Sequence, residues 1–232
     1  VYPVLTFPFC FFASLSEMLI PELTESQVSG RDDRSDSLVN RMLKLCLLFS
    51  IFVAAVLFSF SEPLGIVLYS SSEVGGLIKL LSPLVIIMYM DSVTDGMLKG
   101  LGQQLHSMKY NILDALLSIA MIYLLLPRYA VRAYIFILFF SDCFNFTLSI
   151  RRLSLVSHIR IQIYDILIPV ICGIGGVNFA KLFLRLIGFP LSPSASSIVI
   201  HVLLSSVVYL MLLYITRIIS RRELKEFRIL LQ

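Results

Sequence analysis

Seven apolar stretches separated by short polar connections constrain the fold of this chain more than any other feature. They are Pro3–Ile20, Leu43–Phe60, Gly75–Leu98, Ile112–Leu126, Ala133–Ile150, Ile163–Leu184 and Ser196–Ile218. A helix that crosses a bilayer needs about 17–25 residues, and most of these stretches reach that length. Strands of a β-barrel would alternate polar and apolar residues, whereas these stretches are apolar on every face. The pattern predicts an all-α, polytopic transmembrane bundle of about seven helices over residues 1–218.

The distribution of basic residues predicts the orientation of such a bundle. If the stretches are threaded alternately through a membrane, 14 of the 19 Lys and Arg residues fall on one side. The other side receives only Lys79, Arg128, Arg132, Lys181 and Arg185. Cytoplasmic loops retain Lys and Arg, so the chain is expected to start outside and to end inside the cell. We therefore expect a multi-pass protein of the inner or plasma membrane, with a cytoplasmic C-terminus and an external connection at Ser61–Val74.

Composition agrees with a membrane protein and argues against several other classes. The chain is 58% hydrophobic and 15% charged, whereas a soluble domain carries about 25% charged residues. Its net charge of +4 is explained by the basic loops, so no nucleic-acid partner is expected. The sequence has no HExxH motif, no Walker loop and no CxxC spacing, and its four cysteines lie inside apolar stretches. We expect no enzyme activity, no metal and no cofactor.

The start of the sequence and its last 14 residues lead to two further expectations. The sequence begins with Val1 rather than Met, and we interpret it as a piece of a longer protein that continues upstream. Residues 219–232 are expected to form a cytoplasmic amphipathic tail, either lying on the inner membrane surface or continuing the last helix.

Prolines and glycines predict where the helices end, bend and pack. Pro21 is expected to end the first helix before a polar loop at Pro21–Met42, and Pro83 is expected to kink the third span. Gly96 and Gly100 form a GxxxG pair, which permits close helix packing. Gly100 and Gly102 are also expected to break the helix near the cytoplasmic surface. The residues assigned to packing and loops are therefore Pro21, Gly96, Gly100 and Gly102.

Carboxylates inside the apolar stretches are the candidate functional residues. An ionised acid at the centre of a spanning helix costs about 2.5–3.5 kcal/mol on insertion, so such acids usually face a cavity or a partner. We expect five residues to line a polar cavity for a cation, a proton or a polar head group: Glu17, Asp91, Asp95, Asp142 and Asn145. Two acids have an alternative, in which Asp95 and Asp114 lie at the interface and pair with Lys99 and Lys109. Asp91 and Asp142 have no basic residue nearby on the same span, so the cavity is favoured for both.

Three segments resemble a known transporter family. They are Phe7-Pro8-Phe9 with Ser14-Leu15-Ser16 and Leu19–Glu25, then Glu62-Pro63-Leu64 with Leu68-Tyr69, then Leu98–Gln103. These segments resemble the stage V sporulation protein B family, which exports polysaccharides and lipid-linked precursors within the multidrug/oligosaccharidyl-lipid/polysaccharide superfamily. Order and spacing agree across Phe7–Asn111, and the later stretches agree in hydropathy alone. Glu17, Asp91 and Asp95 do not match the family pattern, so no substrate role is carried over to them.

The resemblance implies a fold of two helix bundles around a central cavity, of which this chain is the C-terminal lobe. The implied function is export or flipping of lipid-linked cell-envelope polysaccharide precursors by alternating access. The implied partners are the lipid bilayer, a lipid-linked sugar or other amphiphile, and an N-terminal lobe of the same protein. Two alternatives remain open at this point: a cation-coupled multidrug antiporter of the same superfamily, and a truncated remnant that inserts into the membrane without transporting.

Overall fold

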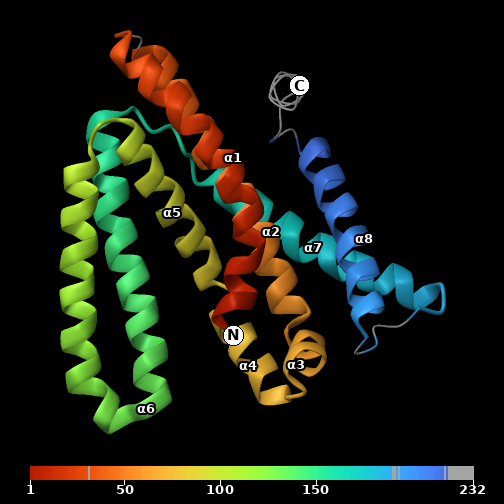
Figure 1. Cartoon of the computed structure of the whole chain (residues 1–232). Coiled ribbons are helices and arrows are strands. Elements are labelled where there is room, and N and C mark those ends of the chain that lie inside the picture. The colour runs from red at the N-terminus through yellow and green to blue at the C-terminus, as the bar shows by residue number, and fades with distance from the viewer. Residues whose placement is uncertain (31, 190–191, 193, 217, 219–232) are drawn as a thin grey trace. The chain divides into compact units, whose positions relative to one another are not determined.

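The computed structural model describes residues 1–30, 32–189, 192, 194–216 and 218, and the regular elements among them are all α-helices (Figure 1). In chain order they are α1 Tyr2–Val28, α2 Asp32–Ser59, α3 Ser61–Tyr69, α4 Ser72–Leu81, α5 Leu84–Gly100, α6 Gln104–Val156, α7 Tyr164–Leu186 and α8 Ala195–Ile215. Two compact units emerge, one over residues 2–50 and 83–161 and the other over residues 51–82 and 162 onward with Val1. The expected tail at 219–232 lies outside the described residues.

The all-α prediction is confirmed, but the expected number of seven spans is wrong. Within the described residues, four helices are long and apolar enough to cross a membrane, namely α2, α6, α7 and α8. A fifth span results if α4 and α5 together count as one. In the first helix, the apolar part Tyr2–Ser14 is shorter than a full span. The remaining difference comes from α6, which contains two of the expected stretches.

The long element α6 is two antiparallel legs joined by a sharp turn. Its 53 residues would extend about 80 Å as one straight helix, far more than the roughly 30 Å hydrocarbon core. At Ala130 the backbone leaves the helical region, with φ 46° and ψ −125°. Ser118 and Ser141, which lie 23 residues apart, are hydrogen-bonded across the legs at 3.1 Å. The expected spans Ile112–Leu126 and Ala133–Ile150 are therefore the two legs of one hairpin, visible in Figure 1.

The outer surfaces of α6, α7 and α8 keep large apolar side chains exposed. Examples are Leu116 at 61%, Ile171 at 69% and Leu203 at 61% exposed. Exposure of many large apolar side chains to water is unfavourable, whereas lipid tails solvate them. These helices are therefore suited to a bilayer.

Pro21 does not end the first helix. Helix α1 continues through Pro21 to Val28, so the expected loop at Pro21–Met42 is wrong. A proline inside a helix costs about 3 kcal/mol, because it removes a backbone hydrogen bond and crowds the preceding turn. Packing of the next turn opposes this cost: Leu23 is fully buried, and Thr24 Oγ1 donates a hydrogen bond to the carbonyl of Gly100 at 3.0 Å.

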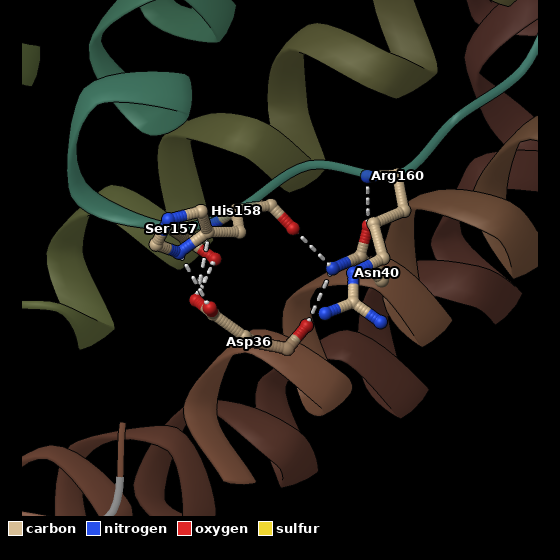
Figure 2. A network of polar contacts seen from close by, with 5 residues as sticks. All are labelled: Asp36, Asn40, Ser157, His158 and Arg160. Atoms are coloured by element: carbon tan, nitrogen blue, oxygen red, sulfur yellow. Dashed lines mark hydrogen bonds and ion pairs between the residues drawn. The ribbon is translucent and has the colours of Figure 1, made fainter. Parts of the chain in front are cut away.

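The polar start of α2 is held by the segment that follows α6, as Figure 2 shows. Asp36 Oδ1 accepts hydrogen bonds from Ser157 Oγ at 2.6 Å and from the backbone N–H of His158 at 3.1 Å. Asn40 Nδ2 donates to the carbonyl of His158 at 2.7 Å, and Asn40 Oδ1 accepts from the backbone N–H of Arg160 at 2.6 Å. These bonds explain why α2 starts at Asp32, eleven residues before the apolar stretch begins. Its 28 residues span about 42 Å, so its first turns extend past a hydrocarbon core.

Helix α5 packs against α1 at the two glycines of the GxxxG pair. A methyl group added at Gly96 would lie 3.4 Å from Ile20 Cδ1, and one added at Gly100 would lie 3.3 Å from Ile20 Cγ2 and Leu23 Cδ2. At the other end of this contact, Tyr89 Oη donates to the carbonyl of Leu5 at 2.6 Å. Small residues thus lie where the two helices come closest.

Gly102 ends α5 in a left-handed conformation, with φ +67°. The N–H of Gly102 bonds the carbonyl of Lys99 at 3.1 Å, and the N–H of Gln103 bonds that of Leu98 at 2.7 Å. This pair of bonds is a Schellman motif, in which glycine accepts the positive φ without a steric penalty. The break separates α5 from α6.

The second unit contains the pairs α3–α4 and α7–α8 together with the end of α2. Its core includes Ala55, Phe60 and Val177, of which the last two are completely buried. The expected kink at Pro83 is confirmed, since the helix is interrupted there: α4 ends at Leu81 and α5 begins at Leu84.

Helices α3 and α4 touch backbone to backbone at Gly65 and Gly75. A methyl group at Gly65 would overlap the backbone of Gly75, lying 2.6 Å from its Cα, and would lie 2.8 Å from the carbonyl oxygen of Ser71. Atoms at that distance cannot remain where they are, so α3 and α4 would have to separate.

We predict that Gly65→Ala lowers the thermal unfolding midpoint of the protein in detergent, since overpacking costs about 1–3 kcal/mol. Gly76→Ala is the matched control: Gly76 lies in α4 next to Gly75, but an added methyl there meets nothing within 4 Å. Alanine is the better helix former, so Gly76→Ala is expected to leave the midpoint unchanged or raised. Equal midpoints for the two variants would contradict the close crossing.

Candidate functional site

A chain of polar side chains connects α5 with both legs of α6. Asn145 Nδ2 donates hydrogen bonds to Asp91 Oδ2 at 3.1 Å and to Asn111 Oδ1 at 2.8 Å. Asp91 lies on α5, Asn111 on the first leg of α6 and Asn145 on the second. Asn145 is only 9% exposed, so its amide makes these bonds away from solvent. A single buried amide thus joins three helical segments.

Asp95 lies at the other end of this row of hydrogen-bonded side chains. It accepts hydrogen bonds from Ser107 Oγ and, at 3.5 Å, from Asn111 Nδ2. Its Oδ2 also lies 3.0 Å from Lys99 Nζ, one helical turn further along α5. Asp95 therefore forms the ion pair that the sequence offered as the alternative to a cavity role.

A second group of polar residues lies further along the hairpin of α6. Ser141 Oγ lies 2.7 Å from both carboxylate oxygens of Asp114 and accepts a hydrogen bond from Ser118. Asp114 thus bonds a serine across the hairpin, whereas the sequence offered Lys109 as its partner. Asp142 follows Ser141 in the chain, and its charge interacts electrostatically with that of Asp114.

Three oxygens in this region are buried without a hydrogen-bond partner among the described residues. They are Asp91 Oδ1, Asp142 Oδ2 and Asn145 Oδ1. All three are acceptors, and an unsatisfied buried acceptor costs about 1–3 kcal/mol. The charges of Asp95, Asp142 and Asp114 also repel that of Asp91. A cation or a proton would satisfy the free oxygens and relieve the repulsion.

The structure brings together three of the five residues expected at the site, namely Asp91, Asp95 and Asn145. Asp142 is linked to this group by electrostatic repulsion. Glu17 is separate: it lies exposed on α1, and no hydrogen bond or ion pair among the described side chains joins it to the group. We call Asp91, Asp95, Asn111, Asp142 and Asn145, with the serines and Asp114 that bond around them, the α5–α6 polar cluster.

Sequence inspection overlooked several members of this cluster, although a pattern was present. Ser107, Asn111, Asp114 and Ser118 recur at spacings of four, three and four residues, which places them on one face of a helix. Ser141, Asn145 and Ser149 repeat every four residues on the opposing leg. Two polar stripes that run into apolar stretches indicate that these faces meet.

The α5–α6 polar cluster combines carboxylates with serine and amide groups. Within the part of the chain that the structure describes, no group of three or more His, Cys, Asp or Glu side chains is arranged to hold a metal ion. Serine hydroxyl and asparagine amide oxygens lie beside the carboxylates in this cluster. Such a site suits a proton, a monovalent cation or a hydrogen-bonding head group better than a transition metal.

We predict that Asn145→Leu destabilises the protein by about 1–3 kcal/mol, because it removes the amide that bonds Asp91 and Asn111. The measurement is the unfolding midpoint in detergent. Thr147→Ala serves as control: Thr147 is exposed and bonds only the carbonyl of Cys143 in its own helix. A loss no larger than that of Thr147→Ala would show that Asn145 does not hold the cluster together.

Comparison with known proteins identifies the region that contains much of this cluster. No curated protein matches the chain. The model of the MatE family matches residues 26–124, which include α2 to α5 and the first leg of α6. Asp91, Asp95, Asn111 and Asp114 fall inside this match, and Asp142 and Asn145 fall beyond it. MatE proteins are membrane transporters, not enzymes. Residues 26–124, less than half of the chain, are therefore similar to a MatE domain, and this similarity points to a membrane transporter.

Proposed function

We propose that residues 1–218 form the C-terminal lobe of an alternating-access transporter that exports or flips lipid-linked cell-envelope polysaccharide precursors. The MatE domain supports a transport function, and the resemblance of Phe7–Asn111 to polysaccharide exporters favours this cargo. In this proposal an N-terminal lobe of the same protein supplies the other side of the pathway, and the lipid tail of the cargo stays in the bilayer.

The observation that carries the proposal is the α5–α6 polar cluster itself. Carboxylates and amides inside spanning helices are costly, and they usually mark a pathway for a substrate or an ion. Asp91 and Asn145 each keep one buried acceptor oxygen free. These acceptors suit the hydroxyl groups of a sugar, and they equally suit a coupling cation.

A second candidate is the cation-coupled multidrug antiporter, which the same free oxygens favour. Asp91 has no basic partner in the described part of the chain, and three other carboxylates repel its charge. A carboxylate in this situation binds a cation or a proton readily. Drug efflux driven by a sodium or proton gradient would therefore support this candidate over the first.

The decisive variant is Asp91→Asn, in the protein expressed from its native gene. The amide keeps the size of the side chain and can still bond Asn145, so membrane insertion and abundance are expected to be normal. Transport of a lipid-linked oligosaccharide is expected to fall at least tenfold. The measurement is the fraction of the oligosaccharide that stays protected from a modifying enzyme added outside. Glu73→Gln, an exposed residue in the first turn of α4, controls for loss of a carboxylate elsewhere. Normal transport by Asp91→Asn and Asp91→Leu would refute a role for this carboxylate.

The orientation of the bundle is also part of the proposal. With a cytoplasmic C-terminus, the α3–α4 hairpin faces outward and the connection after α6 faces inward. Single cysteines at Ser72 and Ser154, both exposed, can be labelled with an impermeant thiol reagent in intact cells of a cysteine-free variant. Labelling is expected at Ser72→Cys alone. Labelling at Ser154→Cys alone would reverse the orientation.

A further inference from the structure

A second polar site lies in the other unit, where α2 ends and α3 begins. It is a pocket of 420 Å³ whose lining includes Phe58, Ser59, Glu62, Lys79 and Lys181. Lys79 comes from α4 and Lys181 from α7. Two lysines from distant parts of the sequence thus line the same pocket.

Each ammonium group is positioned by an aromatic ring. Lys181 Nζ lies 4.7 Å from the ring centroid of Phe60, and Lys79 Nζ lies 5.1 Å from that of Phe58. Lys181 Nζ also donates a hydrogen bond to the carbonyl of Ser59 at 2.5 Å. A lysine ammonium has three N–H donors, so Lys181 keeps two for a ligand. Cation–π contacts orient both groups without neutralising their charge.

The two positive charges are not balanced inside the protein. Among the described residues, neither Lys79 nor Lys181 has a carboxylate within the 4.0 Å of an ion pair. Glu62 is the one acidic residue among those that line the pocket. The two ammonium groups are also close enough to repel each other. An anion between them would remove this repulsion and use their free N–H donors.

The pocket lies near helix ends, which is where a membrane protein meets phosphate groups. Helix α2 ends at Ser59, and Lys181 lies within the last two turns of α7, which ends at Leu186. Basic pockets between spanning helices bind anionic lipid head groups on the cytoplasmic side of membranes. The orientation proposed above places this pocket on the external side, where lipid head groups also carry phosphate. Lysine binds phosphate as a point charge, without the planar geometry that arginine requires.

We propose that this pocket binds a phosphate group, presented either by the head group of an anionic lipid or by a soluble phosphate. Lys79 and Lys181 donate to its oxygens, and Glu62 weakens binding by repulsion. The proposal goes beyond the transport function and does not depend on the cargo, since none of its residues belongs to the α5–α6 polar cluster.

The test uses the purified full chain in a neutral detergent. Its unfolding midpoint is measured against increasing inorganic phosphate, with sodium chloride at equal ionic strength as reference, and separately against dihexanoyl phosphatidic acid, with dihexanoyl glycerol as reference. The unfolding midpoint is expected to rise with both inorganic phosphate and phosphatidic acid. A rise of the midpoint with phosphatidic acid alone identifies a lipid head group as the ligand. No rise with either compound would overturn the proposal.

The variants test whether the pocket itself is responsible. Lys79→Gln removes a charge without touching the Lys181–Ser59 bond, and it is expected to weaken binding about tenfold, the effect of losing one charge-assisted contact. Glu62→Gln is expected to strengthen binding. Lys109→Gln, an exposed lysine of α6, makes the same change of charge elsewhere and is expected to have no effect. Identical weakening by Lys79→Gln and Lys109→Gln would reduce the effect to net charge and refute the site.

Discussion

The buried amide of Asn145 is the contact on which the arrangement of α5 and α6 depends. Its two N–H groups bond Asp91 on α5 and Asn111 on the opposite leg of the hairpin. Apolar packing alone does not define how helices are rotated in a membrane, because lipid tails are as apolar as leucine. A directional hydrogen bond at a buried position defines both rotation and register. The same bonds assemble the acceptor oxygens that make the cluster a candidate site, so the proposed function would use the residues that hold α5 and α6 together.

The hairpin of α6 shows how a chain can place polar groups inside a bilayer at modest cost. Ser141 on one leg bonds both Ser118 and Asp114 on the other, while residues such as Leu116 remain exposed on the outer surface. Each polar group is thereby turned toward another polar group and away from lipid. The turn at Ala130 makes this possible, because it returns the second leg alongside the first.

Sequence alone predicted the all-α class and the kink at Pro83, because hydropathy and proline geometry act locally. The role of the candidate acids stays a prediction. It did not predict the number of spans or the course of the first helix. Pro21 normally ends a helix, but the burial of Leu23 and the bond from Thr24 to Gly100 are long-range contacts. Asn111 was overlooked because a single asparagine near the end of a stretch carries little information until its partner on the opposing leg is known.

The attachment of residues 157–160 to the start of α2 also constrains the order of folding. Asp36 and Asn40 bond partners that lie 118 to 122 positions later in the chain. A ribosome delivers α3, α4, α5 and both legs of α6 before those partners emerge. Asp36 and Asn40 therefore lack these partners until at least 118 further residues have been made. Contacts of such long range slow folding, and a stalled or shortened chain that stops before residue 157 would lack the contact altogether.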